Sequence, residues 1–372
     1  MEKKNENLFE EFISDLKKEM EAMGHVNLII TGKTGVGKST LINNSFRKNM
    51  ADTGVGSPVT DKIRKYHDKD FPLVIYDTVG LELDADKQEA AVKEIKDLCE
   101  KQKLSGDENE YIHVMWYCVD GNGARFEPYE LNYVNEIAKE MPVVIVLTKC
   151  IIKNVAEKLK KEIEKKNSRA VNVMIVRAEK YTDDEGKDMP AFGVEELVEF
   201  TCSLLPEAKQ KAWTNAQSAS LKLKEKMATK VVNQTVIASF GEGYVPLPCS
   251  DCVLLIPTQI SMIARITAIY GLELSEAMFT GIVSSLLGTA GTTFVGRTAV
   301  ANILKTIPGV GTAVGGTISG ATAALLTKAL GEAYIVVMDM VCREGISESD
   351  LESGKLMELL SSIFKEKLGI AK

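Results

Sequence analysis

The chain has 372 residues, a length that predicts about two domains. Its composition is ordinary for a soluble protein, and a formal net charge of −7 argues against a nucleic-acid partner. The seven cysteines lack a repeated paired spacing, which favours a reducing compartment over a disulfide framework. The first residues also lack the apolar core of a signal peptide, so we expect the bulk of the protein to be cytoplasmic.

Residues 1–24 are predicted to form a separate N-terminal helix. Apolar side chains recur at helical spacing between Glu and Lys over residues 6–23, a pattern typical of an amphipathic helix. Two alternatives stay open for its apolar face: it packs on the rest of the same protein, or it contacts a partner or a second copy.

In residues 26–40 a short apolar run breaks into glycines and ends on Lys38 and Ser39. The stretch fits the pattern G-x-x-x-x-G-K-[ST], with strand-like sequence before it and helix-like sequence after it. Glycines let backbone N–H groups turn toward a triphosphate, and the following helix offers its positive end. Lys38 then reaches the β and γ phosphates, and Ser39 ligates Mg²⁺. The predicted triphosphate-binding residues are Gly32, Lys33, Thr34, Gly35, Val36, Gly37, Lys38, Ser39 and Thr40.

A helix predicted over residues 38–46 runs into residues 49–58, a glycine-containing stretch without either periodicity that we expect to be a mobile loop. At its end, Thr60 precedes an alternating segment that contains Ile63 and Tyr66. A hydroxyl where a loop enters a strand is well placed to close over the γ-phosphate and complete the Mg²⁺ shell. We therefore predict that Thr60 is a Mg²⁺ ligand.

Residues 71–76 (FPLVIY) predict a buried strand that places Asp77 at its end, with Gly80 three residues later. Asp77 is expected to hold the Mg²⁺ or its water, and Gly80 lets a backbone N–H approach the γ-phosphate. The next residue is Leu81, whose apolar side chain cannot orient an attacking water, so we expect hydrolysis to be slow or to use a group from elsewhere. The predicted catalytic residues are Lys38, Thr60 and Gly80, and the predicted metal ligands are Ser39, Thr60 and Asp77.

Two further apolar runs, residues 113–120 and 142–148, are of the kind that is buried on both faces of a parallel sheet. Helix-like sequence separates each strand from the next, so residues 25–205 predict an α/β domain with a doubly wound, mostly parallel sheet of the P-loop NTPase type. Arg125, in the loop after the first run, is either a solvated surface charge or a phosphate-directed arginine.

The strand that ends at Thr148 is followed by Lys149 and then by Ile151. Guanine-binding proteins commonly carry [NT]-K-x-D here, and the Asp accepts hydrogen bonds from the base. Because Ile151 replaces that acceptor, the choice between guanine and adenine stays open. Lys149 can still cover the base with its aliphatic stem, and the backbone N–H of Ala178 can meet the base carbonyl. Candidates for a substitute acceptor are Glu179, Asp183 and Asp184.

From residue 206 to residue 372 the sequence predicts an all-α domain that is apolar and rich in glycine. Residues 212–232 predict a basic amphipathic helix, after which charge nearly vanishes. Either this domain is a water-soluble bundle with a buried apolar hairpin, or the hairpin enters or spans a membrane. The three segments long enough for the second alternative, each with at most one charged residue, are 253–270, 277–296 and 306–327.

The segments GKTGVGKST, SPVT, DTVG and HVMWYCVD, with TK in place of TKxD, together resemble a bacterial GTPase of the translation-factor-related class. The nearest groups by motif are the Era-like and immunity-related GTPases. Residues 243–271 resemble the start of a helical domain of unknown function that follows such GTPases and also occurs in inner-membrane proteins. The resemblance implies GTP and Mg²⁺ as ligands, with Lys149 and Ala178 at the base.

This resemblance favours a switch that hydrolyses GTP with Mg²⁺ and couples its nucleotide state to the helical domain. Two alternatives are a membrane-inserting effector gated by nucleotide, located at the inner membrane, and a nucleotide-binding module with little or no hydrolysis. Gly35 stands where potassium-activated relatives carry Asn, so we expect no help from potassium. A homodimer across the nucleotide face, as in the immunity-related and dynamin-like groups, is an alternative source of charge for the transition state of hydrolysis.

Overall fold

A computed structural model of the chain describes residues 2–48, 57–60, 63–78, 85–123, 125–242, 251–272, 275, 279, 320–344 and 362–368. The predictions for Gly80, Leu81, the loop at 49–56 and nearly all of residues 277–319 lie outside these described residues. Contacts within the chain define two compact units. The sheet unit is Met23–Ser220, and the helical unit is Met1–Ala22 together with Leu221–Lys372.

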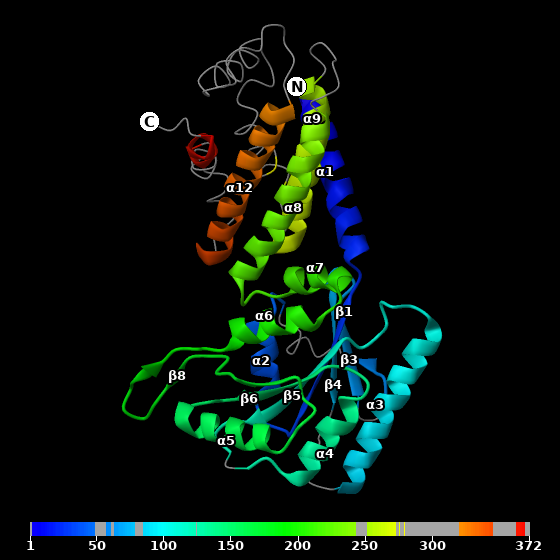
Figure 1. Ribbon diagram of the computed structural model, residues 1–372, viewed down its shortest axis with the longest axis vertical. Coiled ribbons are helices and arrows are strands. Elements are labelled where there is room, and N and C mark those ends of the chain that lie inside the picture. Colours follow the sequence, from blue (N-terminus) through cyan, green and yellow to red (C-terminus); the bar gives the residue numbers. More distant parts are fainter. Residues whose placement is uncertain are drawn as a thin grey trace. The chain divides into compact units, whose positions relative to one another are not determined.

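The sheet unit is built on a seven-stranded sheet in the order β2-β3-β4-β1-β5-β6-β7 (Figure 1). Strands β4, β1, β5, β6 and β7 run parallel, whereas β3 is antiparallel to β4 and β2 is antiparallel to β3. Every residue of β1 and β6 is buried, as expected for apolar strands with helices on both faces. The predicted doubly wound, mostly parallel sheet is confirmed. The strands are β1 (Val26–Gly32), β2 (Ser57–Pro58), β3 (Ile63–His67), β4 (Leu73–Thr78), β5 (Val114–Asp120), β6 (Val143–Thr148) and β7 (Asn172–Ile175).

One face of the sheet is covered by three helices that share a single apolar core with the strands (Figure 1). They are α3 (Ala85–Ser105), α4 (Pro128–Ile137) and α5 (Lys153–Lys165). Each helix places a fully buried aliphatic side chain in that core: Ile95, Val134 and Ile163. The burial of these side chains orients the helices and leaves their charged faces in solvent.

The opposite face carries α2 (Lys38–Ser45), α6 (Val194–Leu204) and α7 (Glu207–Ala216) around a group of aromatic rings (Figure 1). The Trp116 ring stacks on Phe46 at 5.9 Å and meets Trp213 edge-on at 5.8 Å, while its indole N–H donates to Thr201. Because Trp213 is fully buried here, α7 packs in the sheet unit, although the sequence predicts that the helical domain begins at residue 206.

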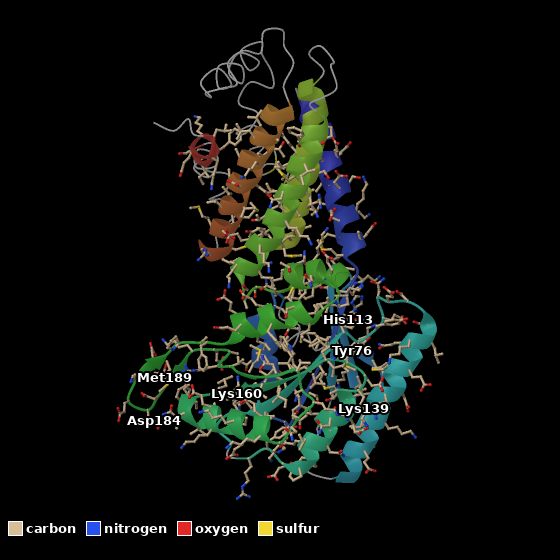
Figure 2. The ribbon with its side chains drawn as sticks, viewed as in Figure 1. Tyr76, His113, Lys139, Lys160, Asp184 and Met189 are labelled. Carbon is tan, nitrogen blue, oxygen red and sulfur yellow. The ribbon has the colours of Figure 1, made fainter. Side chains whose placement is uncertain are left out.

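After β7 the chain forms a small hairpin of β8 (Tyr181–Thr182) and β9 (Asp188–Met189). Figure 2 labels Asp184 in its turn and Met189 in β9. An isolated antiparallel β-bridge between Arg177 and Phe192 joins the two ends of the segment that contains this hairpin. The hairpin thus extends the loop that follows β7, at the carboxyl edge of the sheet.

The helical unit contains α1 (Glu2–Met23), α8 (Leu221–Glu242), α9 (Asp251–Tyr270) and α12 (Gly320–Glu344), with a further helical stretch at residues 362–367. Phe12 of α1 is fully buried and its ring stacks on Phe279 with 4.6 Å between centroids. The amphipathic N-terminal helix is confirmed, and its apolar face packs on its own protein.

The basic helix expected over residues 212–232 is interrupted. α7 ends at Ala216 and α8 begins at Leu221, because the Gln217 side chain accepts a hydrogen bond from the Ser220 N–H and closes a turn between them. Lys224 is not on a solvated basic face but is 2% exposed. Its ammonium donates to the carbonyls of Ile269 and Tyr270, the last residues of α9, where a positive charge is favourable.

Helices α8 and α12 approach closely at Gly331. A Cβ atom on Gly331 would lie 2.5 Å from a methyl carbon of Val232 and 3.1 Å from the sulfur of Met262, so only glycine fits this position. Residues 306–319 of the glycine-rich segment lie outside the described residues. In the part of the chain that the structure describes, no helix is both long and apolar enough to cross a membrane.

Candidate functional site

The loop between β1 and α2 has the backbone that its glycines permit. Gly32 has a φ of 140° and Gly37 a φ of 96°, both in the region that favours glycine. A Cβ atom on Gly32 would lie 2.3 Å from the carbonyl oxygen of Cys118, so a larger residue would collide with β5. α2 begins directly afterwards at Lys38 and has no acidic residue in its first turn, which leaves its positive end available to an anion.

The Lys38 ammonium lies within this loop. It donates to the carbonyl oxygen of Gly32 at 3.0 Å and to that of Lys33 at 3.4 Å, so its charge is held where phosphate oxygens would enter. The other predicted phosphate-binding residues divide by exposure: Thr34, Gly35 and Ser39 are exposed, Gly37 and Thr40 are half-buried, and Val36 is buried.

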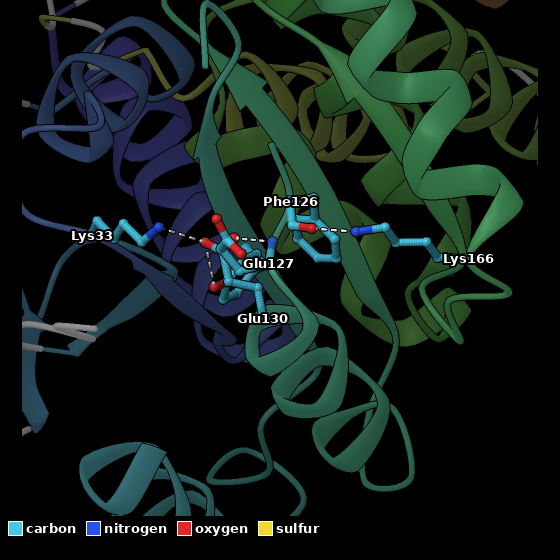
Figure 3. A network of polar contacts seen from close by, with 6 residues as sticks. Lys33, Phe126, Glu127, Glu130 and Lys166 are labelled. Atoms are coloured by element: carbon cyan, nitrogen blue, oxygen red, sulfur yellow. Dashed lines mark hydrogen bonds and ion pairs between the residues drawn. The ribbon is translucent and has the colours of Figure 1, made fainter. Parts of the chain in front are cut away.

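A carboxylate that the sequence analysis did not single out, Glu130, binds the lysine that follows Gly32. Glu130 is 2% exposed, and its Oε1 lies 3.3 Å from the ammonium of Lys33 (Figure 3). The same oxygen accepts from the Tyr117 hydroxyl, and Oε2 accepts from the Glu127 N–H. The network therefore joins the loop to the start of α4 and to β5.

Lys33 keeps its positive charge in this setting. Burial, the largest influence on its pKa, acts downward, but the contacts with Tyr129 and Glu130 outweigh it and the pKa is raised. The spacing of Glu127 and Glu130 around Pro128 is a helix-start signal in the sequence, yet it does not reveal the pairing with Lys33. Arg125, just before this helix, is exposed.

Asp77 occupies the end of β4, next to β1. Its Oδ1 is buried and has no hydrogen-bond partner among the described residues. Burial raises the pKa of this carboxyl, and the nearby charges of Lys38 and Arg64 partly oppose the rise. A buried carboxylate oxygen without a partner fits a Mg²⁺ ion or one of its water ligands, so the residues present are compatible with the expected metal.

Thr60 lies in a short turn at the start of β3. Its hydroxyl donates to Glu94 of α3 at 2.8 Å and accepts from the N–H of Ile63 at 3.0 Å. The structure therefore directs this hydroxyl to α3, and the predicted Mg²⁺ contact of Thr60 stays a prediction. Gly80, the remaining predicted catalytic residue, is outside the described residues.

On the other side of the loop, Thr148 joins three elements of the sheet unit. Its hydroxyl lies 2.5 Å from the carbonyl oxygen of Val36 and 3.0 Å from that of Val119. Lys149 follows with a φ of 55°, and its stem lies 3.5 Å from where a Cβ of Gly37 would be. Thr148 and Lys149 are thus brought to the phosphate-binding loop, as their place in the sequence predicts.

Asn122 is a second residue that the sequence analysis did not single out. Its amide nitrogen donates to the carbonyl oxygen of Lys149 at 2.6 Å, and its amide oxygen accepts from the N–H of Ile151 at 3.1 Å. The turn that carries Lys149 is therefore held on both sides by one side chain. The sequence Asp-Gly-Asn-Gly at residues 120–123 is typical of a turn, but it does not reveal that Asn122 binds the turn after β6.

A cavity of about 220 Å³ adjoins the phosphate-binding loop. Its wall is formed by the start of α2, the turn after β6 and the loop after β7. Lining residues include Gly37, Lys149, Ile151, Arg177, Ala178 and Glu179. The structure thus brings Ala178 to the same cavity as Lys149, as expected of two residues that contact one base.

Two protein-family models match this chain. Residues 27–149 match the 50S ribosome-binding GTPase family, and residues 208–367 match DUF697, a domain of unknown function. A curated relative, Magnetosome membrane protein 22 of Magnetospirillum gryphiswaldense, is 26% identical over 109 residues, which are 29% of this chain and 56% of that protein. The chain thus matches little more than half the length of that relative.

Two similar solved structures each match about half of the chain. The septin GTPase domain from Chlamydomonas reinhardtii has 17% sequence identity and a TM-score of 0.34, over 51% of this chain and 97% of that chain. A probable GTP-binding protein, engB, has 24% identity and a TM-score of 0.32, over 48% of this chain and 98% of that chain. The two family matches therefore identify a GTPase domain at residues 27–149 and a C-terminal DUF697 domain at residues 208–367.

Proposed function

We propose that this protein hydrolyses GTP with Mg²⁺ and transmits its nucleotide state to the DUF697 domain. The observation that carries the proposal is the pair of Lys38, inside the phosphate-binding loop, and Asp77, whose unpartnered carboxylate oxygen fits Mg²⁺ or its water. Mg²⁺ would neutralise phosphate charge, and Lys38 would stabilise the charge that develops on the γ-phosphate. Backbone groups near Thr60 and Gly80 would hold the attacking water.

The test is the loss of nucleotide binding on removal of the Lys38 ammonium. We expect Lys38→Ala to abolish GTP binding in isothermal titration calorimetry and phosphate release in a turnover assay. Lys160→Ala, which removes a surface lysine of α5 (Figure 2), is the matched control and should behave as the wild type. Hydrolysis retained by Lys38→Ala would refute the assignment.

Hydrogen bonds between the end of α2 and α7 support the transmission. α2, which begins at the phosphate-binding loop, ends next to α7: the N–H of Ser218 donates to the Ser45 carbonyl and the N–H of Arg47 to the Ala216 carbonyl, both at 3.0 Å. The Arg47 guanidinium also donates to the Asn215 side chain at 2.8 Å. α7 is the first helix of the DUF697 match and leads directly into α8, so a displacement of α2 would reach that domain through its backbone.

Hydrogen exchange tests this route. We expect a non-hydrolysable GTP analogue to change exchange in α8 of the wild type, and we expect Asn215→Ala to reduce that change while GTP affinity stays within about twofold. Ser203→Ala, at an exposed position in α6, serves as the control. If the hydrogen-exchange rates in α8 of the wild type were the same with and without the analogue, transmission of the nucleotide state to α8 would be excluded.

A second candidate function is a membrane-associated effector whose apolar segments respond to nucleotide. It is favoured by the curated relative that is named a magnetosome membrane protein and by the low charge of residues 253–327. In that case the protein is cytoplasmic with a peripheral or integral attachment to the inner membrane. A homodimer through the nucleotide face would supply the transition-state charge that Leu81 cannot.

A further inference from the structure

The cavity beside the phosphate-binding loop has an apolar side chain where guanine-binding sites commonly place a carboxylate. Ile151 lines the cavity, and its own N–H is bound by Asn122. Guanine carries N–H donors at N1 and N2, and a donor left without an acceptor on binding costs affinity. An acceptor for these donors therefore has to come from another segment of the chain.

The loop after β7 carries a candidate for that acceptor. Among the described residues that line the cavity, Glu179 alone carries a carboxylate. It directly follows Ala178, which lines the same cavity, so a base that contacts the backbone of Ala178 lies within reach of the Glu179 side chain. Glu179 is exposed, which leaves its carboxylate accessible to a ligand that enters from solvent.

The two other acidic candidates have different roles in the structure. The Asp183 carboxylate accepts from the N–H groups of Glu185 and Lys187, at 3.1 and 2.8 Å, and so closes the turn between β8 and β9. Asp184 lies in the same turn (Figure 2), exposed and away from the cavity lining. Neither is placed to accept from a base in the cavity.

Arg177 also lines this cavity, and its guanidinium carries hydrogen-bond donors that have no partner among the described residues. Its guanidinium lies over the ring of Phe192 at 4.9 Å, and its backbone exchanges two hydrogen bonds of 2.9 Å with Phe192. Its Nε and Nη1 atoms are buried and have no hydrogen-bond partner among the described residues. A planar group with unsatisfied donors that is fixed on an aromatic ring suits a ligand with adjacent acceptors.

Guanine matches this donor and acceptor pattern and adenine does not. Guanine presents two acceptors, O6 and N7, on one edge and the N2 amino donor on another, whereas adenine has a donor, its N6 amino group, in place of O6. We infer that Glu179 and Arg177 are the residues that select guanine in this protein. Glu179 accepts from the N1 and N2 groups, and Arg177 donates at the edge that carries O6 and N7. This inference rests on the proposed function, because it concerns the base of the same nucleotide.

Calorimetric titration of the full chain with Mg²⁺ and four diphosphates, GDP, IDP, XDP and ADP, tests the role of Glu179. We expect the wild type to bind GDP at least tenfold more tightly than XDP or ADP, with IDP between them because inosine lacks the N2 amino group. Glu179→Gln should lower GDP affinity at least tenfold and raise XDP affinity, since the amide can donate to the extra carbonyl of xanthine. Asp184→Asn makes the same charge change in the neighbouring turn and should match the wild type.

These measurements distinguish a failure of the role assigned to Glu179 from a failure of the proposed function. If Glu179→Gln bound GDP like the wild type and gained nothing for XDP, the role of Glu179 would be overturned while the proposed function stood. A wild-type chain that bound none of the four nucleotides would overturn the proposed function and this inference with it. Thermal unfolding of each variant shows that a lost affinity does not reflect a lost fold.

Arg177→Met provides an independent readout, because methionine keeps an apolar contact with Phe192 but has no donors. We expect the ratio of GDP to ADP affinity to fall at least tenfold. The ratio is informative even if the variant is less stable, since unfolding lowers both affinities together. An unchanged ratio would overturn the role of Arg177.

Discussion

The side chains of the candidate site differ in how they are held. Lys33 and Thr148 have dedicated partners within the protein, Glu130 for the first and the Val36 carbonyl for the second. Asp77 has a buried oxygen without a partner among the described residues. The first two therefore shape the loop in the absence of nucleotide, whereas Asp77 is left for a ligand.

Replacement of Asp77 by asparagine tests its role toward Mg²⁺. We expect Asp77→Asn to raise the Mg²⁺ concentration needed for half-maximal GTP binding by about tenfold, because a neutral amide is a weaker ligand for a hard cation than a carboxylate. The measurement is a Mg²⁺ titration at fixed GTP. Asp70→Asn, at an exposed position before β4, is the control. A midpoint that does not move in Asp77→Asn would remove Asp77 from the metal site.

His113 makes the stability of the sheet unit sensitive to pH. Burial, aided by the charge of Lys209, lowers the pKa of His113 from 6.5 to about 4, and its Nδ1 accepts from the N–H of Asn27. Since the unfolded chain binds the proton more readily, the contribution of His113 is complete above pH 6.5 and is lost as the pH falls from there toward about 4. At pH 5.5 the loss of unfolding free energy is on the order of 1 kcal/mol.

His113→Gln keeps an acceptor at this place (Figure 2) and does not titrate, so its unfolding midpoint should depend less on pH between 7.5 and 5.5 than that of the wild type. Urea unfolding followed by tryptophan fluorescence measures this, because both Trp116 and Trp213 are buried in the sheet unit. Equal pH dependence in the two proteins would contradict the assigned cause.

Among the described helices of the helical unit, α8 and α12 pack most extensively against each other, and Gly331 permits this packing. We expect Gly331→Ala to destabilise this unit by about 1–3 kcal/mol despite the better helix propensity of alanine, because the added methyl group would meet Val232. Val232→Ala in the same chain should recover part of the loss. Thermal unfolding of the two single variants and the double variant checks this, and independent, additive losses would argue against the contact.

At the scale of the whole molecule, the membrane and dimer proposals make separate predictions. Flotation with liposomes of bacterial lipid composition, with and without a non-hydrolysable GTP analogue, tests the first: a nucleotide-dependent fraction at the top of the gradient is expected. If the protein never floats, the effector alternative fails.

For the dimer proposal, GTP turnover per molecule should rise with protein concentration, whereas constant turnover would exclude activation by dimerisation.

The sequence by itself determined the sheet, the phosphate-binding loop and the N-terminal helix. Each of these follows from local patterns. Continuous apolar runs predict buried strands, and the spacing from Gly32 to Ser39 requires a tight turn before a helix. Apolar side chains, Phe12 among them, recur at helical spacing over residues 6–23. Such patterns act between residues that are close in the chain, so one sequence is enough to recognise them.

Only the tertiary structure decided which distant residues complete the site. Glu130 meets Lys33, Asn122 holds Lys149, and Glu179 rather than Asp183 lines the base-side cavity, because strand ends far apart in sequence meet at one edge of the sheet. In the helical unit, Lys224 caps the end of α9 and does not lie on a basic face, because α8 packs against α9. Side-chain partners of this kind depend on packing, and no local period encodes them.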